Sequence, residues 1–307
     1  MSVRGASLFA LVSVLWGMPY LFIKIAMEHG FTPLSLVWLR LVLALLILLP
    51  LATRAGALSQ LKGHWRAITA YALVEIVVPF PMIAEGERHI NSSMAAIVVA
   101  TVPLLVALMA LAFDRSDRIT PRQLGGLLVG FGGVVMLVGL GAGSSSHELL
   151  GVGEVLIAAL GYALGPLILR HYFQEVDARA SMAATMAIAA LVLTPIAAFD
   201  IPARLPSLSG FAAVIALGVI CSAMAFVAMA LLIREIGASQ AVVITYVNPV
   251  IALLLGVLFL SERPGFGSLA GLALILLGSW ASASGRSRSR SPRDRGPSEP
   301  QPEVAGP

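Results

Sequence analysis

The chain alternates long apolar runs with short polar stretches along nearly its whole length. Apolar runs of this length are typical of transmembrane helices. We expect ten such helices, over residues 6–26, 33–52, 66–86, 92–113, 123–141, 151–171, 179–199, 209–233, 238–260 and 266–284. Backbone groups in lipid must be satisfied internally, and no strand-like alternation is present. The pattern therefore predicts an all-α integral membrane protein.

The composition excludes an ordinary water-soluble domain. The chain is 58% hydrophobic and 12% charged, whereas soluble domains carry about 25% charged residues. The net charge of +4 does not indicate a nucleic-acid partner, because most arginines lie in the C-terminal tail or at the ends of apolar runs. The five histidines are scattered and Cys221 stands alone, so we expect no metal site and no cofactor.

The distribution of basic residues predicts which side of the membrane holds the termini. With ten spans, one side receives both termini and four of the loops, and it carries 15 lysines and arginines. The other side carries Lys24, Arg88, Arg204 and Arg263. Because cytoplasmic loops are rich in basic residues, we expect both termini in the cytoplasm. Residues 285–307 are basic and proline-rich, and we expect a disordered cytoplasmic tail.

The second half of the chain repeats the first after a shift of 146 positions. The shift aligns proline, glycine and helix boundaries in one register, for example Pro103 with Pro249 and Gly125 with Gly271. We interpret the chain as two five-helix repeats over 1–141 and 151–284, joined by a linker over 142–150. Since five is odd, the repeats must lie in opposite orientations, and inverted repeats are typical of secondary transporters.

Prolines inside the spans are candidate helix breaks. Pro79, Pro103 and Pro249 each remove a backbone donor and free a carbonyl, and such carbonyls are tolerated where they face protein or a wet cavity. We therefore consider these prolines candidates for gating. Prolines are also common in membrane helices without any such role.

Both ends of the repeat pair resemble the EamA family of the drug/metabolite transporter superfamily. "VLWGMPYLFIKIAMEHGFTPLSLVWLRLVLALLILLPL" is similar to its opening helices, through Trp16-Gly17, Lys24, Pro33 and Arg40. "ASQAVVITYVNPVIALLLGVLFLSERPGFGSLAGLALILLGSW" is similar to its closing helices, through Pro249, Glu262, Gly271 and Gly278. The first repeat departs from the pattern, because Ser116 stands where Glu262 stands in the second.

The resemblance implies a ten-helix exporter of small metabolites, amino acids or drugs. It further implies that spans 1–4 and 6–9 surround a cavity, with spans 5 and 10 more peripheral. It does not fix the solute, because substrates vary widely within the family.

Charged residues at membrane depth are expensive and hence candidates for function. Glu75 stands in the middle of a span, on the same helical face as Tyr71. It is our first candidate for binding a proton or a substrate ammonium, and competition between the two would produce antiport. The alternative is a structural pair between Glu75 and Arg40.

Aromatic and amide side chains add further candidates. Trp16 and Tyr20 lie on one stripe of the first span, and Tyr162 matches Trp16 under the shift. The remaining candidates, just before Pro249, are Thr245, Tyr246 and Asn248. These side chains could line a cavity and stack on a solute or bind a cation. Trp and Tyr also favour the membrane interface, which leaves that interpretation open.

The sequence thus favours a secondary active transporter in the plasma membrane, working on a small solute, over an enzyme. Intramembrane catalysis needs a nucleophile–base pair or metal ligands at depth, and the sequence has no HExxH or GxSxG motif. No P-loop motif is present, so the chain does not power transport by its own ATP hydrolysis. An uncoupled facilitator or an importer of the same fold remains the alternative. Substrate, direction, coupling ion and homodimer formation stay open.

Overall fold

The computed structural model describes residues 2–113, 120–141, 145–173, 176–241 and 243–284. The predicted tail over 285–307 and Ser116 lie outside these residues. All regular elements of the described residues are helical, and the ten predicted spans are confirmed. Eight are long and apolar enough to cross a membrane, and two further apolar helices are shorter.

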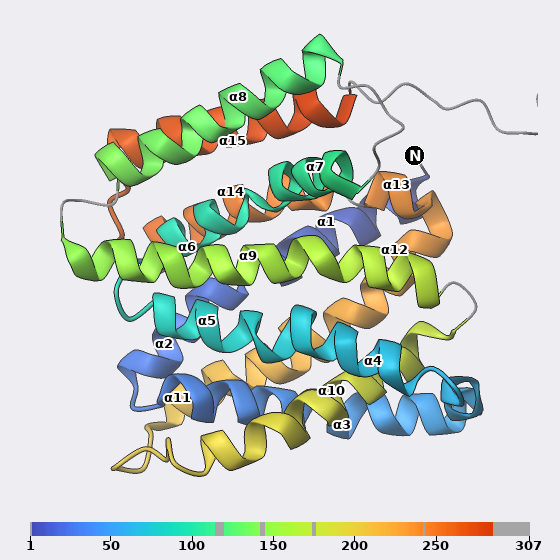
Figure 1. Cartoon of the computed structure of the whole chain (residues 1–307). Helices are drawn as coiled ribbons and strands as arrows, with labels where there is room; N and C mark the ends of the chain where they lie inside the picture. Colours follow the sequence, from blue (N-terminus) through green and yellow to red (C-terminus); the bar gives the residue numbers. More distant parts are fainter. Residues whose placement is uncertain (1, 114–119, 142–144, 174–175, 242, 285–307) are drawn as a thin grey trace, which may run out of the picture.

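The first half contains five spans (Figure 1). They comprise α1 (Val3–Gly17) with α2 (Pro19–Glu28), α3 (Pro33–Arg54), α4 (Trp65–Ala72) with η2 (Leu73–Val77) and α5 (Pro79–Gly86), α6 (Ser92–Val99) with α7 (Val102–Phe113), and α8 (Pro121–Met136) with η3 (Leu137–Gly141). A short helix, η1 (Ala57–Leu61), follows α3.

The second half repeats this arrangement. It comprises α9 (Ser146–Tyr172), α10 (Ala178–Ala197), α11 (Leu208–Ile215) with η4 (Ala216–Met224) and α12 (Ala225–Ile236), α13 (Ala238–Ala241) with α14 (Ile244–Phe259), and α15 (Phe266–Ser284). Helix α9 begins at Ser146, so it includes part of the stretch expected to be a linker.

Matching spans of the two halves pack against each other. Helix α3 contacts α10, α6 contacts α14, and α8 contacts α15. The contact of α5 with α9 in turn matches that of α1 with α12. Span 3 thus contacts span 6 as span 8 contacts span 1, and a two-fold axis that relates the halves requires this pairing. The chain therefore consists of two inverted repeats.

Glycines allow α8 and α15 to approach closely at the edge of the bundle (Figure 1). The backbone of Gly126 lies against Gly278, whereas Gly133 lies against Gly271. The contacts therefore run in opposite directions along the two helices, which are antiparallel. Gly125 faces open space, although it matches Gly271 in the repeat.

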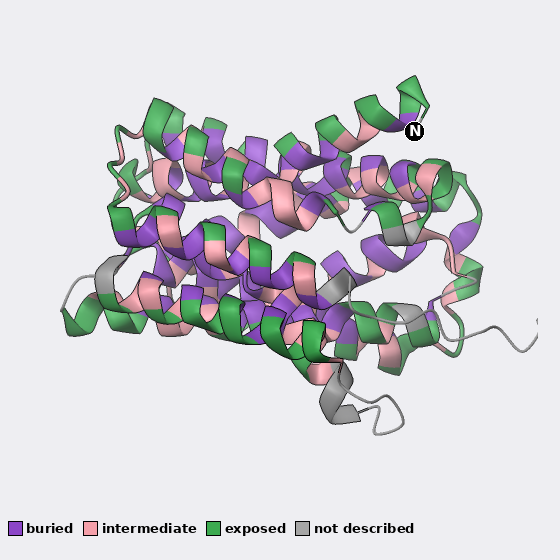
Figure 2. Ribbon diagram, turned by 90° about the horizontal axis from the view of Figure 1, so that it is seen from above, coloured by how far each residue is buried: buried purple, intermediate pink, exposed green. Residues whose placement is uncertain are grey.

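The outer surface of the bundle is apolar, as a lipid-facing surface must be. Large side chains such as Leu46, Val135 and Leu191 are 65%, 72% and 73% exposed. Seen from above in Figure 2, buried residues occupy the inner faces of the helices and exposed residues the outer faces. Small side chains, alanine above all, make up much of the interior, and they allow close helix packing.

The helices are irregular at matching places in the two halves. Helix η2 is a π-helical turn in span 3, and η4 is a longer π-helical segment in span 8. Shifted by 146 positions, η2 falls inside η4. Only Val78 separates η2 from Pro79, and the Val78 amide donates five residues back to the Leu73 carbonyl at 3.0 Å. Such bulges frequently mark functional sites.

The other two candidate prolines differ from each other. Pro103 lies in the first turn of α7, after the break at Ala100 and Thr101 that separates α6 from α7. Pro249 lies inside the continuous helix α14. In the second half the corresponding span divides earlier, between α13 and α14. The repeat thus places the prolines equivalently, but not the helix breaks.

Candidate functional site

Five of the candidate side chains gather inside the bundle, and they come from four different spans. Tyr162 of α9 lies within electrostatic reach of both Glu75 and Arg40. Tyr71 neighbours Glu75 and Tyr162, and Tyr20 neighbours Tyr162 and Arg40. We call these five residues the central cluster: Tyr20, Arg40, Tyr71, Glu75 and Tyr162.

Glu75 stands halfway along the 22-residue span 3, within the π turn η2. The side chain is partly buried, and its Oε2 atom is enclosed and has no hydrogen-bond partner among the described residues. The carboxylate lies directly against Gly165 of α9, where any side chain would overlap with it. One turn away, the Val74 carbonyl oxygen lies against Gly161, where a side chain would likewise overlap with it. The spacing of Gly161 and Gly165 is the signal in the sequence that could have indicated this contact.

Arg40 is 5% exposed and is fixed by two contacts. Its Nε atom donates to Ser222 Oγ at 2.8 Å, and its guanidinium lies over the Phe80 ring at 4.1 Å from the centroid. Ser222 belongs to η4, so Arg40 connects span 2 to the π segment of the second half. Within the described residues, Arg40 and Glu75 form no ion pair. Sequence reasoning missed Ser222 and Phe80.

The other four candidates lie where α1 meets α12 and α14. With its amide nitrogen oriented toward two carbonyls, Asn248 donates to Ser13 O at 3.1 Å and to Ile244 O at 3.0 Å. Trp16 packs edge-on against Phe226, with 5.7 Å between ring centroids. Thr245 and Tyr246 occupy the first turn of α14. The amide of Asn248 thus ties α14 to α1.

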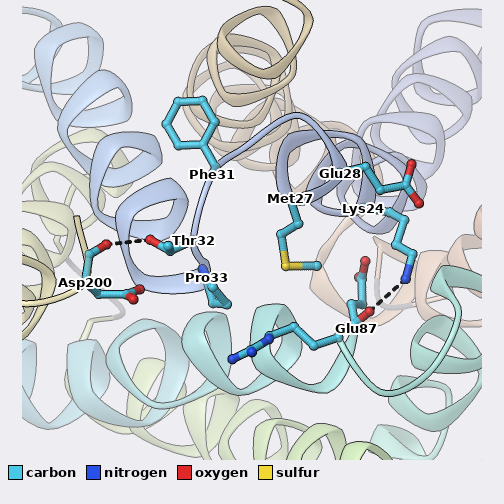
Figure 3. A pocket seen from close by; sticks show the side chains of 9 residues that line it. Lys24, Met27, Glu28, Phe31, Thr32, Pro33, Glu87 and Asp200 are labelled. Carbon is cyan, nitrogen blue, oxygen red and sulfur yellow. Dashed lines mark hydrogen bonds between the residues drawn. The ribbon is translucent and has the colours of Figure 1, made fainter. Parts of the chain in front are cut away.

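A cavity of about 480 Å³ lies at one end of the bundle (Figure 3). Lys24 and Glu87 lie on one side of it, and Thr32 and Asp200 lie on the other. Its lining comes from the ends of spans 1, 2, 3 and 7 and comprises Lys24, Met27, Glu28, Phe31, Thr32, Pro33, Glu87, Arg88 and Asp200. This cavity was not predicted from the sequence.

Polar side chains connect the cavity to the central cluster. Lys24 Nζ donates to the backbone oxygen of Glu87 at 2.9 Å. Tyr20, one turn before Lys24, lies within electrostatic reach of Glu87 as well as of Arg40. A series of polar groups therefore runs from the mouth of the cavity to the middle of the bundle.

Glu262 joins the two repeats beside this cavity. Its Oε1 accepts from the Ser92 amide and hydroxyl, both at 2.8 Å, and its Oε2 accepts from the Ser93 amide at 3.0 Å and from the Ser93 hydroxyl. The first amides of a helix have no partner within the helix, and a negative charge there is stabilised by the helix dipole. Glu262 thus caps α6 from the loop that precedes α15.

The described residues contain no group of three or more histidine, cysteine, aspartate or glutamate side chains arranged to hold a metal ion. The chemistry available at the central cluster is therefore that of one carboxyl group, one guanidinium and three phenols. These groups bind protons, amines and anions through hydrogen bonds and charge.

Comparison with known proteins identifies relatives along nearly the whole chain. The model of the EamA-like transporter family matches residues 3–139 and again residues 149–283. The chain is 33% identical over 255 residues to the uncharacterized inner membrane transporter YedA of Escherichia coli (strain K12), covering 81% of this chain and 80% of that protein.

More distant relatives are also named as transporters. The chain is 25% identical over 296 residues to an uncharacterized transporter of Archaeoglobus fulgidus, covering 91% of this chain and 96% of the relative. A solved crystal structure aligns with a TM-score of 0.66 at 20% identity, covering 91% of this chain and 97% of the other. This last likeness concerns the fold alone.

Proposed function

Because this chain belongs to the EamA-like transporter family, we propose that it exports small organic solutes from the cell by alternating access, in exchange for protons. The observation that carries the proposal is the partly buried carboxylate of Glu75, which lies at mid-depth in a π turn and whose buried Oε2 has no hydrogen-bond partner among the described residues. A group this costly to bury is retained in a membrane protein mainly where it binds something.

The inverted repeats supply the movement that alternating access requires. Because the two halves have the same fold in opposite orientations, each half can adopt the conformation of the other. Rocking one half against the other therefore opens the centre of the bundle to one side of the membrane or to the other. The cavity at the end of spans 1, 2, 3 and 7 supports this view, because Glu87 of its lining lies within electrostatic reach of Tyr20 of the central cluster. In this arrangement Tyr20, Arg40 and Tyr71 are buried, and Glu75 and Tyr162 are partly buried.

Glu75 is the proposed coupling group. A carboxyl group without a partner in the protein interior binds either a proton or a cationic group of the solute. If both compete for the same carboxyl, binding of one releases the other, and the two fluxes run in opposite directions. Arg40 presents a guanidinium that no carboxylate of the described residues neutralises, and we propose that it holds an anionic group of the solute.

We further propose that both termini lie in the cytoplasm, since 15 of the lysines and arginines fall on that side. The cavity lined by Lys24 and Glu87 then opens to the outside of the plasma membrane. The name of the relative from Escherichia coli, an inner membrane transporter, supports this location.

Metabolite profiling of the culture medium tests the proposal. Cells would express the wild-type chain, Glu75→Gln, the surface variant Glu235→Gln, or an empty vector, at matched amounts in the membrane. We expect one or more solutes to accumulate outside with wild type and Glu235→Gln but not with Glu75→Gln. Accumulation that continues after the proton gradient is collapsed would instead indicate an uncoupled facilitator. Depletion of a solute from the medium would indicate an importer.

A further inference from the structure

Among the glutamates at the cavity end of the bundle, Glu85, Glu262 and Glu87 have very different surroundings. Glu85 pairs with Arg88 at 2.6 Å. Glu262 accepts hydrogen bonds from the amides and hydroxyls of Ser92 and Ser93. Glu87 is 0% exposed, and neither of its carboxyl oxygens has a hydrogen-bond partner in the part of the chain that the structure describes. Glu87 is therefore the exception among these neighbours.

Among the described residues, no cation in contact with the Glu87 carboxyl balances its charge. Lys24 reaches the backbone oxygen of Glu87 rather than its carboxyl group, and Arg88 is held by Glu85. The other titratable groups that face it are Tyr20 of α2 and Glu262 of the loop before α15. The remaining charged groups around the cavity are Glu28 and Asp200, and Asp200 Oδ2 accepts from the Leu34 amide at 3.0 Å.

An ionised carboxylate in these surroundings is unfavourable, because it has lost its water without gaining a partner. Burial raises the pKa of Glu87 well above its ordinary value; the charge of Lys24 partly offsets this, and the charge of Glu262 adds to it. The neutral acid is thus the form that fits the enclosed position. Each carboxyl oxygen exposes less than 1 Å², which leaves no access for an amine or a metal ion.

We propose that Glu87 is a second proton-binding site, placed at the mouth of the transport pathway and separate from Glu75. The carboxylate takes a proton from the water of the cavity and becomes a neutral acid that stays enclosed. When it returns the proton to that water, the charged side chain must move to where water or Lys24 can reach it. The closed arrangement of the cavity lining around Glu87 is then linked to the pH of the water that fills the cavity.

This inference rests on the proposed function in one respect: it adds a proton site to a cycle in which Glu75 is the coupling group. Tyr20 lies within electrostatic reach of Glu87 and of the cluster member Tyr162, and Tyr162 in turn lies within reach of Glu75. If the cavity opens to the outside, a proton that enters through it meets Glu87 before it meets Glu75.

The direction of the pH effect follows from linkage. Because the enclosed arrangement favours the neutral acid, it is most stable at low pH and is weakened as the pH rises through the pKa of Glu87. Replacement by glutamine keeps the size of the side chain and removes the titration. The Glu87→Gln variant should therefore hold the mouth in the enclosed arrangement at every pH.

Infrared difference spectroscopy on the full chain in lipid nanodiscs tests protonation directly. We expect a carbonyl stretch of a protonated carboxylic acid at pH values where an ordinary glutamate, with a pKa of about 4.3, is ionised. This band should be as strong in Glu85→Gln as in wild type and weaker in Glu87→Gln, where only the contribution of Glu75 remains. A spectrum of Glu87→Gln that retains the full band would overturn the proposal. The Glu75→Gln spectrum reports separately on the proposed coupling group. The proposal for Glu87 and the proposal for Glu75 can therefore be rejected independently.

A labelling experiment tests the movement of the mouth. In a Cys221→Ala background, Met27→Cys places a thiol in the cavity lining, and Leu205→Cys places one in a loop where the side chain is 89% exposed. The rate of maleimide labelling at position 27, divided by that at position 205, removes the intrinsic pH dependence of the thiol. We expect this ratio to rise severalfold with pH in the background and to stay flat with Glu87→Gln. An equal rise in both would overturn the proposal.

Discussion

The carboxylate of Glu75 occupies the space that a side chain at Gly165 would fill. The two residues belong to different repeats, so the position of the proposed coupling group depends on the missing side chain of a neighbouring helix. This contact also explains how a glutamate fits at mid-depth between closely packed spans.

Replacing Gly165 with alanine should therefore displace Glu75. Its Cβ atom would overlap with the carboxylate, and overpacking of this kind costs about 1–3 kcal/mol. We expect export of the solute found by metabolite profiling to fall on the order of 100-fold, as a misplacement of about 1 Å can produce. Gly153→Ala is the matched control, since Gly153 lies in the same helix and faces open space. Equal export by both variants would show that Glu75 does not need its observed position.

The second prediction concerns the surroundings of Arg40. Lysine lacks both the Nε donor that binds Ser222 and the planar group that stacks on Phe80. Arg40→Lys should therefore lower the free energy of unfolding in mixed micelles by about 1.5–3 kcal/mol, the range for a hydrogen bond to a charged group. Double-mutant cycles should give a larger coupling energy for Arg40 with Ser222 than for Arg40 with Glu75. The opposite order would support the structural pair between Arg40 and Glu75.

The ten spans could be predicted because lipid imposes one simple requirement, a long apolar helix, on each of them. The local breaks could not. Pro79 and Pro249 both lack an amide hydrogen, yet only Pro79 follows a π turn, and Pro249 lies inside a regular helix. The difference depends on neighbours such as Gly161, which leaves space for the Val74 carbonyl. Such contacts between helices are not encoded in the pattern of one span.

The same reasoning applies to the candidate site. Polar residues are scarce inside the spans, so Glu75, Arg40 and Tyr162 were identifiable from the sequence, and the structure brings them together. Asn248 looked equivalent, but its amide is used to join α14 to α1. Glu87 was missed because charged residues surround it in "EGERH", as in a solvated loop. Its burial comes from distant segments, which a local pattern does not reveal.

The third prediction concerns Glu262, which caps α6 from the other repeat. Glutamine keeps the shape but loses the negative charge and half of the acceptors for the Ser92 and Ser93 donors. We expect Glu262→Gln to lower the free energy of unfolding by about 1–2 kcal/mol, from charge at a helix terminus and charge-assisted hydrogen bonds. Glu28→Gln, an exposed carboxylate at the same end of the bundle, should change it by less than about 0.5 kcal/mol. Equal changes in the free energy of unfolding for the two variants would mean that the Glu262 cap does not stabilise the fold.

The fourth prediction concerns two glycines that occupy equivalent positions in the two repeats but have different surroundings in the structure. Gly278 lies against the backbone of Gly126 and Gly130, whereas its counterpart Gly132 faces open space. Gly278→Ala should therefore separate α8 from α15 and cost about 1–3 kcal/mol. Gly132→Ala should instead stabilise its helix by about 0.5–1 kcal/mol. Thermal unfolding in one detergent compares the two. A destabilised Gly132→Ala would contradict the packing described for this pair of helices.

The last prediction concerns Asp177, which precedes α10 outside the membrane spans. Its Oδ1 accepts from the Arg179 amide at 2.8 Å, and its Oδ2 pairs with Arg179 Nη2 at 2.7 Å. Hydrogen bonding from the Arg179 side chain lowers the pKa of Asp177 from 3.8 to about 2. Because the pKa is lower in the folded protein, the ionised group contributes stability above its ordinary pKa, and this is lost as the pH falls toward 2.

Two substitutions separate the cap of α10 from the charge of Asp177. Asparagine caps a helix about as well as aspartate, so Asp177→Asn should lose only the pairing with Arg179. Its deficit in thermal stability at pH 7 should shrink as the pH falls below about 4, the ordinary range of an aspartate. Asp177→Ala should lose a further 0.5–2 kcal/mol, roughly the value of the cap, at every pH. A deficit of Asp177→Asn that stays constant down to the lowest pH at which the protein remains folded would show that the ion pair does not stabilise the fold.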